Sequence, residues 1–266
     1  MNRKKQITVI SFLLVLILGI GSYTIYSNTK RVEDNLNLSF ANNYISYVIN
    51  EEDKTMKFNL FGLLDTSSTN DEILQKINSL SLNNSEMIIM DFEVDSGIIY
   101  KGHQIVNFII EIEFKSLDTL SADTLFINYS DNKEEAFEIG EITLANSSQF
   151  QTEDSIDITE AHTIGYPSPS LEITLDNQGD NEIKIINVYD LNKTINSSIN
   201  EFYIKSNDSN QLIVDEFDNT GEDIDFYTVT PIIEYRSGDI NNEYVLPGMI
   251  YGVLLSDEEK IDMMLN

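Results

Sequence analysis

The 266-residue chain contains no cysteine, and this absence removes several kinds of site at once. Without thiols there is no disulfide, zinc–thiolate centre, iron–sulfur cluster or cysteine nucleophile. A lipoprotein anchor is excluded as well, because it needs a cysteine to acylate. Any folded domain of this chain must therefore be stabilised by its hydrophobic core alone.

Basic residues are also scarce. The chain has 16 Lys and Arg residues against 45 Asp and Glu residues, and its formal net charge is −29. Residues 1–31 contain five of the basic residues and no acidic one, so the remainder carries 11 basic and 45 acidic residues, about −34 in net charge. Such a surface repels nucleic acids, anionic lipid headgroups and other polyanions. We expect no nucleic-acid partner, and the charge favours cations, basic partners or simple solubility.

Only one long apolar run is present. Residues 7–26 contain no charged side chain and follow the basic cluster Arg3, Lys4 and Lys5. Twenty residues in a helix span roughly the 30 Å hydrocarbon core of a bilayer, and the basic end stays cytoplasmic. We therefore predict a single-pass transmembrane anchor at 7–26 in the lipid bilayer of the cell membrane. Residues 1–6 would be cytoplasmic, residues 27–35 a juxtamembrane stalk, and everything beyond them extracellular.

A cleaved signal peptide is the alternative for the same run, since Gly19 and Gly21 could supply the small residues of a cleavage site. Against it, no Ala-x-Ala site is present, and Tyr23 and Tyr26 stand where an interfacial aromatic belt would lie. A cysteine-free exported chain rich in Ile and Asn is also typical of a low-GC Gram-positive bacterium.

Beyond the apolar run, the recurring period is two. In residues 108–115, apolar side chains at even positions alternate with mostly polar ones, as in a half-buried antiparallel strand. Similar runs follow along the chain, and the polar residues 130–133 have the length of a hairpin turn. Gly140 interrupts one run, which resumes one step out of phase as a β-bulge would. Residues 176–181 separate two further runs, so we expect a second hairpin there.

This pattern predicts a mainly β protein with two antiparallel, immunoglobulin-like β-sandwich domains. We place the first at residues 36–149 and the second, with a short C-terminal helix, at 150–266, because residues 146–155 show no apolar alternation. Residues 166–170 are the competing boundary. Helical patterns interrupt the strands at residues 70–80, with Ile73, Leu74, Ile77 and Leu80 on one face, and after Ser256, which forms a capping box with Glu259.

No catalytic signature stands out. The two histidines, His103 and His162, are far apart in sequence, and no Gly-x-Ser-x-Gly elbow is present. Residues 130–133, Ser-Asp-Asn-Lys, match short strings of penicillin-interacting enzymes, but both strings fall in one hairpin turn and no Lys-Thr-Gly accompanies them. We therefore expect no enzyme. An exported hydrolase is the alternative, and it requires a histidine beside a serine or carboxylate in a pocket.

No tryptophan is available to stack on sugars, although 13 tyrosines keep a carbohydrate-binding module open. Calcium needs several oxygen ligands from one loop. The carboxylates around Gly221 do not fit the EF-hand pattern, since residue 227 is Tyr. An irregular site remains, for which we predict Asp218, Asp223 and Asp225 as the metal ligands, with Asp176, Asp180 and Glu182 as the alternative set. We expect no cofactor apart from this candidate calcium ion.

Together these observations predict a membrane-anchored, non-enzymatic surface or envelope protein that interacts with another protein. A carbohydrate- or calcium-binding module and an exported hydrolase are the alternatives. The sequence identifies neither ligand nor partner.

Overall fold

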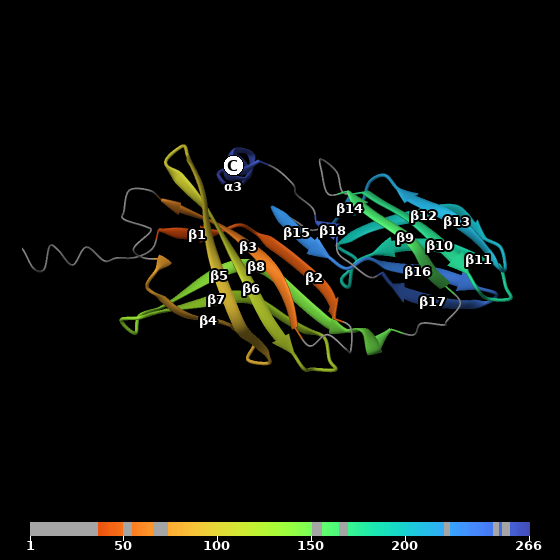
Figure 1. The fold of residues 1–266 in the computed structure, drawn as a ribbon, viewed down its shortest axis with the longest axis horizontal. Helices are drawn as coiled ribbons and strands as arrows, with labels where there is room; N and C mark the ends of the chain where they lie inside the picture. The colour runs from red at the N-terminus through yellow and green to blue at the C-terminus, as the bar shows by residue number, and fades with distance from the viewer. Residues whose placement is uncertain are drawn as a thin grey trace, which may run out of the picture. The chain divides into compact units, whose positions relative to one another are not determined.

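The computed structural model describes residues 37–49, 55–65, 74–150, 156–164, 170–220, 224–246, 250–251 and 256–266 (Figure 1). The chain divides into two units, Met1–Asn37 and Leu38–Asn266, and all strands of the described residues belong to the second. The predicted anchor at 7–26, with residues 1–6 and 27–35, lies outside the described residues. Within the described ranges, no helix has the length and apolar character needed to cross a membrane.

Strands account for most of the described chain. Those before residue 150 are β1 (Leu38–Phe40), β2 (Asn43–Ile49), β3 (Thr55–Asp65), β4 (Ile77–Leu82), β5 (Met87–Tyr100), β6 (His103–Phe114), β7 (Leu120–Tyr129) and β8 (Glu134–Asn146). A 3₁₀ turn, η1 (Ser147–Gln149), follows β8. The later elements are β9 (Ile156–Ile164), β10 (Ser170–Asn177), β11 (Ile183–Tyr189), β12 (Ile195–Ile204), β13 (Asp208–Val214), β14 (Asp218–Asn219), β15 (Phe226–Val229), β16 (Ile232–Ser237), β17 (Ile240–Val245), β18 (Ile250–Tyr251) and helix α3 (Asp257–Met264).

The strands form four sheets, so the predicted mainly β class is confirmed. Their orders are β1-β3-β6-β5, β18-β15-β2-β8-β7-β4, β13-β10-β9 and β14-β12-β11-β16-β17. The first two sheets pack on each other, with Phe40 of β1 lying 5.7 Å from Phe137 of β8 between ring centroids. The last two share a core cluster built from β10, β11, β12, β13 and β16. Pairing is antiparallel except on both sides of β2, which pairs in parallel with β8 and β15.

The alternation predicted for residues 108–115 is confirmed in β6. Phe108, Ile110 and Ile112 are fully buried, while the residues between them are partly exposed. The predicted β7–β8 hairpin is also present, with Asn128 opposite Glu134. Three residues of β8 around Gly140 lie against one residue of β7, which is the expected bulge. The capping box of Ser256 and Glu259 starts α3 as predicted.

Two predicted local structures differ from the structure: the helix expected at residues 70–80 is wrong for residues 77–80, and the second hairpin is wrong. Residues 77–82 form strand β4, paired with β7, and not the end of a helix; residues 66–73 lie outside the described residues. The loop after β10 does not close a hairpin, because β10 pairs with β9 and β13 whereas β11 pairs with β12 and β16. Asn177 fixes this connection between two sheets by donating to the carbonyl oxygens of Asn181 and Ile204 at 2.7 and 3.0 Å.

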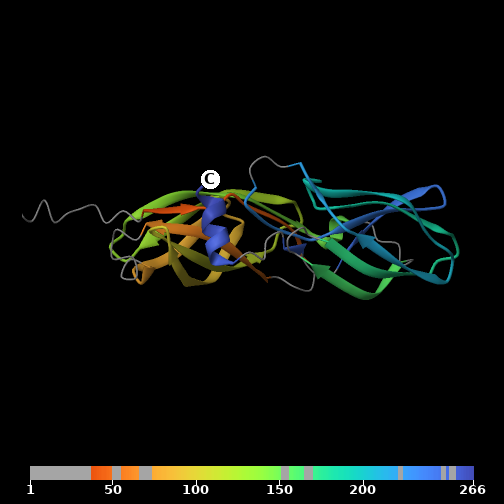
Figure 2. The ribbon, with the colours of Figure 1, turned by 90° about the horizontal axis from the view of Figure 1, so that it is seen from above.

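The C-terminal part of the chain returns to strands of the N-terminal part. Strand β15 pairs with β2, and β18 pairs with β15. Helix α3 packs on β5 and β6 through Ile261, which is fully buried against Leu63 and Ile105 (Figures 1 and 2). The domain boundary at residues 149 and 150 stays a prediction, and two later elements, β15 and α3, pack on strands that precede it.

We predict that Gly140→Ala destabilises the protein more than Gly102→Ala. Both glycines have positive φ angles, +87° and +82°, which cost an alanine about 1–2 kcal/mol. A Cβ at Gly140 would also lie 2.1 Å from the Asn43 carbonyl oxygen of β2, whereas a Cβ at Gly102 would meet nothing within 4 Å. Urea unfolding of the two variants measures the difference, and equal losses would contradict the close β2–β8 approach.

Candidate functional site

The predicted calcium ligands have different environments. Asp218 is exposed on β14, and Asp223 lies outside the described residues. Asp225 precedes β15, and its Oδ2 accepts a hydrogen bond from the Asn42 backbone N–H at 2.7 Å. No group of three or more potential metal-ligating side chains is present among the described residues, which include the alternative set Asp176, Asp180 and Glu182. The calcium site stays a prediction. The structure shows in addition that Asp225 is hydrogen-bonded to Asn42, directly before β2.

The possible catalytic residues are not brought together in the described chain. His103 begins β6, opposite Asp65 of β3 and Tyr100 of β5. His162 belongs to β9, and its side chain lies outside the described part. Ser130 and Lys133 occupy the β7–β8 turn, where Lys133 forms an ion pair with Glu135 at 2.5 Å. The structure thus explains residues 130–133 as a hairpin turn.

A buried polar junction lies where β2 meets the turn after β11. The Tyr44 hydroxyl donates to Asp190 Oδ2 at 2.5 Å, and both residues are almost completely buried. Asp190 also accepts from the backbone N–H groups of Ile195 at 2.8 Å and Asn192 at 3.2 Å. One carboxylate therefore receives three hydrogen bonds, which compensate the cost of burying it.

The surrounding strands extend this junction. The Leu191 N–H donates to Ser46 Oγ at 3.2 Å, and the Val48 N–H donates to Thr230 Oγ1 at 3.1 Å. Six of the eight buried polar residues in the described chain lie here, which identifies the junction as structural: Asn43, Ser46, Thr143, Asp190, Thr228 and Thr230. Tyr44, Ser46, Asp190 and Thr230 are hydrogen-bonded within the junction, so it holds segments from distant parts of the sequence together.

A different surface is exposed along β5. This strand is an edge of its sheet and pairs with β6 in the described structure. It carries four of the nine exposed large apolar residues in the described chain: Ile88 at 45% exposed, Met90 at 57%, Ile98 at 43% and Ile99 at 63%. A concentration of exposed apolar side chains on one strand is a feature of interaction surfaces.

Three exposed carboxylates, Asp91, Glu93 and Asp95, lie on one face of β5, opposite Glu111, Ile109 and Asn107 of β6. We call this strand face the acidic row. Two lysines lie nearby, but their ion pairs are with β6: Lys57 with Glu111 at 3.2 Å and Lys115 with Glu113 at 2.7 Å. No Lys, Arg or His of the described ranges lies within 4.0 Å of a carboxylate oxygen of the acidic row.

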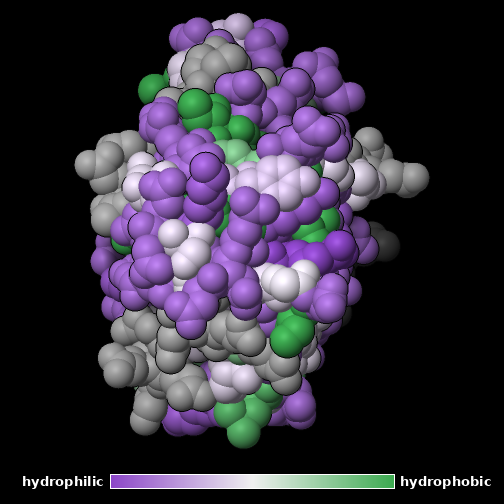
Figure 3. Space-filling model, turned by 90° about the vertical axis from the view of Figure 1, so that its right-hand side faces the viewer, coloured by the Kyte–Doolittle hydropathy of each residue, from purple (hydrophilic) through white to green (hydrophobic). Residues whose placement is uncertain are grey.

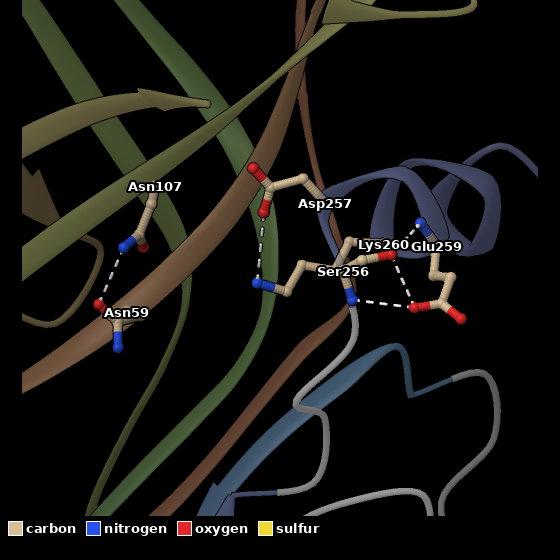
Figure 4. A network of polar contacts seen from close by, with 6 residues as sticks. All are labelled: Asn59, Asn107, Ser256, Asp257, Glu259 and Lys260. Atoms are coloured by element: carbon tan, nitrogen blue, oxygen red, sulfur yellow. Dashed lines mark hydrogen bonds and ion pairs between the residues drawn. The ribbon is translucent and has the colours of Figure 1, made fainter. Parts of the chain in front are cut away.

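Helix α3 continues the acidic row at one end. A Cβ on Gly97 would lie 2.9 Å from Asp257 Oδ2, so the first residue of α3 is directly beside β5. Figure 4 shows Asp257 and Lys260 at the start of this helix, near the hydrogen bond from Asn107 Nδ2 to Asn59 Oδ1. Asn107 Oδ1 is buried and is the one such side-chain atom without a partner among the described residues. The Lys101–Asp262 ion pair, at 2.6 Å, also fastens α3 to the end of β5.

The surface around the sheet β14-β12-β11-β16-β17 differs from that of β5 in having few exposed apolar side chains (Figure 3). Polar side chains cover most of the face in Figure 3, and apolar ones form only small separate patches. A hollow of about 360 Å³ lies in the second half of the chain, lined in part by Lys184, Tyr203 and Arg236. Lys184 Nζ lies 5.6 Å from the centre of the Tyr203 ring. The cation covers one face of the ring that would otherwise be available for a sugar.

The sequence analysis missed the edge at β5. Residues 87–100 lack strict alternation, because two bulges interrupt the strand between Ile89 and Asp91 and between Ser96 and Ile99. The one sequence signal was the spacing of Asp91, Glu93 and Asp95, which places three carboxylates on one face if the segment is a strand.

No protein-family model and no curated protein matches this chain. Among solved structures, a protein of unknown function from Porphyromonas gingivalis W83 is similar over 79% of this chain and 97% of that chain, with 10% sequence identity and a TM-score of 0.22.

We predict that Tyr44→Phe destabilises the protein by about 1–3 kcal/mol at pH 7, because Asp190 loses one of its three donors. Burial, and then the nearby Asp190 carboxylate, raise the pKa of Tyr44 above its usual value of 10.0. The unfolded chain therefore loses this proton first, and the contribution of Tyr44 declines as pH rises above about 10. Urea unfolding at neutral and alkaline pH should show the difference between wild type and Tyr44→Phe becoming smaller.

The matched control is Tyr203→Phe, since this tyrosine is 44% exposed. It should change stability by less than about 0.5 kcal/mol at pH 7. If Tyr44→Phe were no less stable than this control, the buried hydrogen bond would not stabilise the junction.

For calcium, we predict that changing Asp218, Asp223 and Asp225 together to Asn abolishes any calcium-dependent rise in Tm. The variant should also be less stable without calcium, because an asparagine at position 225 replaces the charged acceptor of the Asn42 N–H by a neutral, weaker one. Neutralising Asp131, Glu134 and Glu135 in the β7–β8 hairpin is the control of equal charge. If both variants respond to calcium as wild type does, these aspartates bind no calcium.

Proposed function

We propose that this chain is a non-enzymatic protein-interaction module, anchored in the cell membrane by residues 7–26 and exposed on the outer side. The observation that carries the proposal is strand β5. It is a long sheet edge with four exposed apolar side chains beside a row of carboxylates that have no ion-pair partner in the described chain. Such a surface suits contact with another protein.

The sequence supports the location. The basic cluster Arg3, Lys4 and Lys5 precedes the apolar run, as in a helix with a cytoplasmic N-terminus. The acidic remainder of the chain would be exposed at the cell surface or in the envelope. Its negative charge repels nucleic acids and anionic lipids, so these are unsuitable ligands. The proposed architecture on this anchor is a pair of immunoglobulin-like sandwiches, whose strands form a scaffold for exposed edges and loops.

The buried junction supports the role of a rigid carrier. Tyr44, Ser46 and Asp190 join segments that are more than 140 residues apart in sequence. A surface displayed on such a scaffold keeps its geometry while a partner binds, which lowers the entropic cost of association. The junction would therefore support binding by keeping the scaffold rigid, and its residues need no catalytic role.

We predict that protease added to intact protoplasts degrades the chain beyond Arg31 and that the protein stays in the membrane fraction. Changing Arg3, Lys4 and Lys5 together to Gln should increase the fraction that is protected from the protease, because the orientation signal is removed. Release of the protein into the medium, with a new N-terminus near Ser22, would contradict the anchor.

A further inference from the structure

Resting on the proposed interaction function, we propose that β5 binds a basic, extended segment of a partner protein as an additional strand of the β1-β3-β6-β5 sheet. The segment would alternate Lys or Arg with apolar residues. Its basic side chains would lie on the acidic row, and its apolar ones would face the core side of the sheet.

The length of β5 distinguishes it from the other sheet edges. It has 14 residues, whereas the other edge strands of the described sheets have between two and nine: β1, β4, β9, β13, β14, β17 and β18. An edge strand carries backbone N–H and C=O groups with no strand to pair with. The Phe92 N–H is instead bonded to the preceding carboxylate, Asp91 Oδ1, at 2.9 Å. This local bond can be exchanged for one to an incoming strand.

The core side of β5 is incompletely covered. Phe92 and Val94 lie opposite Ile110 and Phe108, which are fully buried at 0% exposure. Phe92 and Val94 themselves are only half-buried, and no strand of the described ranges flanks them on the open side. An apolar side chain from an added strand would pack against them and remove their remaining surface from water.

The opposite face determines the charge of the partner. Asp91, Glu93 and Asp95 follow one another at every second residue, so they match the basic side chains of an extended segment with the same period. A second copy of β5 would place carboxylates opposite carboxylates, which is destabilising. The occupant is therefore a basic segment of another protein and not the same strand of a second copy.

The bulges limit the pairing length. Between them, Asp91–Ser96 is in regular register with Val106–Glu111 of β6. Because bulges interrupt the ladder, the added strand would pair mainly over these six residues. The exposed Met90 and Ile98 flank this stretch and would contact the ends of the bound segment.

The experiment measures binding of a labelled synthetic peptide of alternating Lys and Val to the purified full-length protein in detergent. We expect saturable binding, and about tenfold weaker binding to Asp91→Asn/Glu93→Gln/Asp95→Asn, since each exposed charge pair contributes up to about 1 kcal/mol. The control of equal charge is Asp176→Asn/Asp180→Asn/Glu182→Gln, which should bind nearly as well as wild type. Circular dichroism verifies that both variants are folded.

A second peptide tests strand addition without changing the protein. Methylation of alternate backbone nitrogens keeps every side chain charge but removes the hydrogen bonds of a paired strand, so it should weaken binding about tenfold or more. Equal binding of the methylated peptide, equal losses in the two triple variants, or absence of binding would each overturn the inference. The membrane anchor of the proposed function is tested separately, because its failure would appear as release of the protein from the membrane and would leave the peptide-binding result unchanged.

Discussion

The structure depends on one buried carboxylate. Asp190 lies in the turn after β11 and accepts hydrogen bonds from Tyr44 of β2 and from two backbone N–H groups of its own turn. Removing one partner of such a group leaves a buried charge undersolvated, which costs more than the hydrogen bond itself contributes. The bond therefore restricts how the segment around Asp190 can lie against β2.

Strand β2 has neighbours on all sides. It pairs in parallel with β8 and β15, and its residues include the buried polar side chains Asn43 and Ser46. Polar side chains on so buried a strand require partners at defined positions. Ser46 accepts from the Leu191 N–H of the turn after β11, and the Asn43 amide bonds to the backbone of Ala41, Ile139 and Phe61. At β2 the centre of the fold is thus closed by strand pairing on both sides, whereas the edge at β5 leaves apolar and acidic side chains exposed. A closed centre with an open edge is the basis of our proposed function.

The amino-acid sequence predicts local structure here better than it predicts strand partners. Alternation identified the buried face of β6, and Gly140 marked the bulge in β8, because both depend on neighbouring residues alone. The prediction of a hairpin at the loop after β10 failed, because turn-forming residues can join two strands of one sheet or strands of two different sheets. Ile77 and Leu80 fit a helix face but belong to β4, where pairing with β7 overrides local preference. The candidate edge at β5 depends on which strands lie beside it, which no local pattern records.

Hydrogen exchange of the full-length protein, measured by mass spectrometry, tests the central claim of a closed centre and an open edge. Amides of Asn43–Ile49 should be among the slowest to exchange, because β2 is paired on both sides. Peptides covering Asp91–Ser96 should exchange about half of their amides much faster, since β5 is paired on one side in the described structure. Protection of Asp91–Ser96 equal to that of Asn43–Ile49 would show that the β5 edge is already covered and would contradict the account.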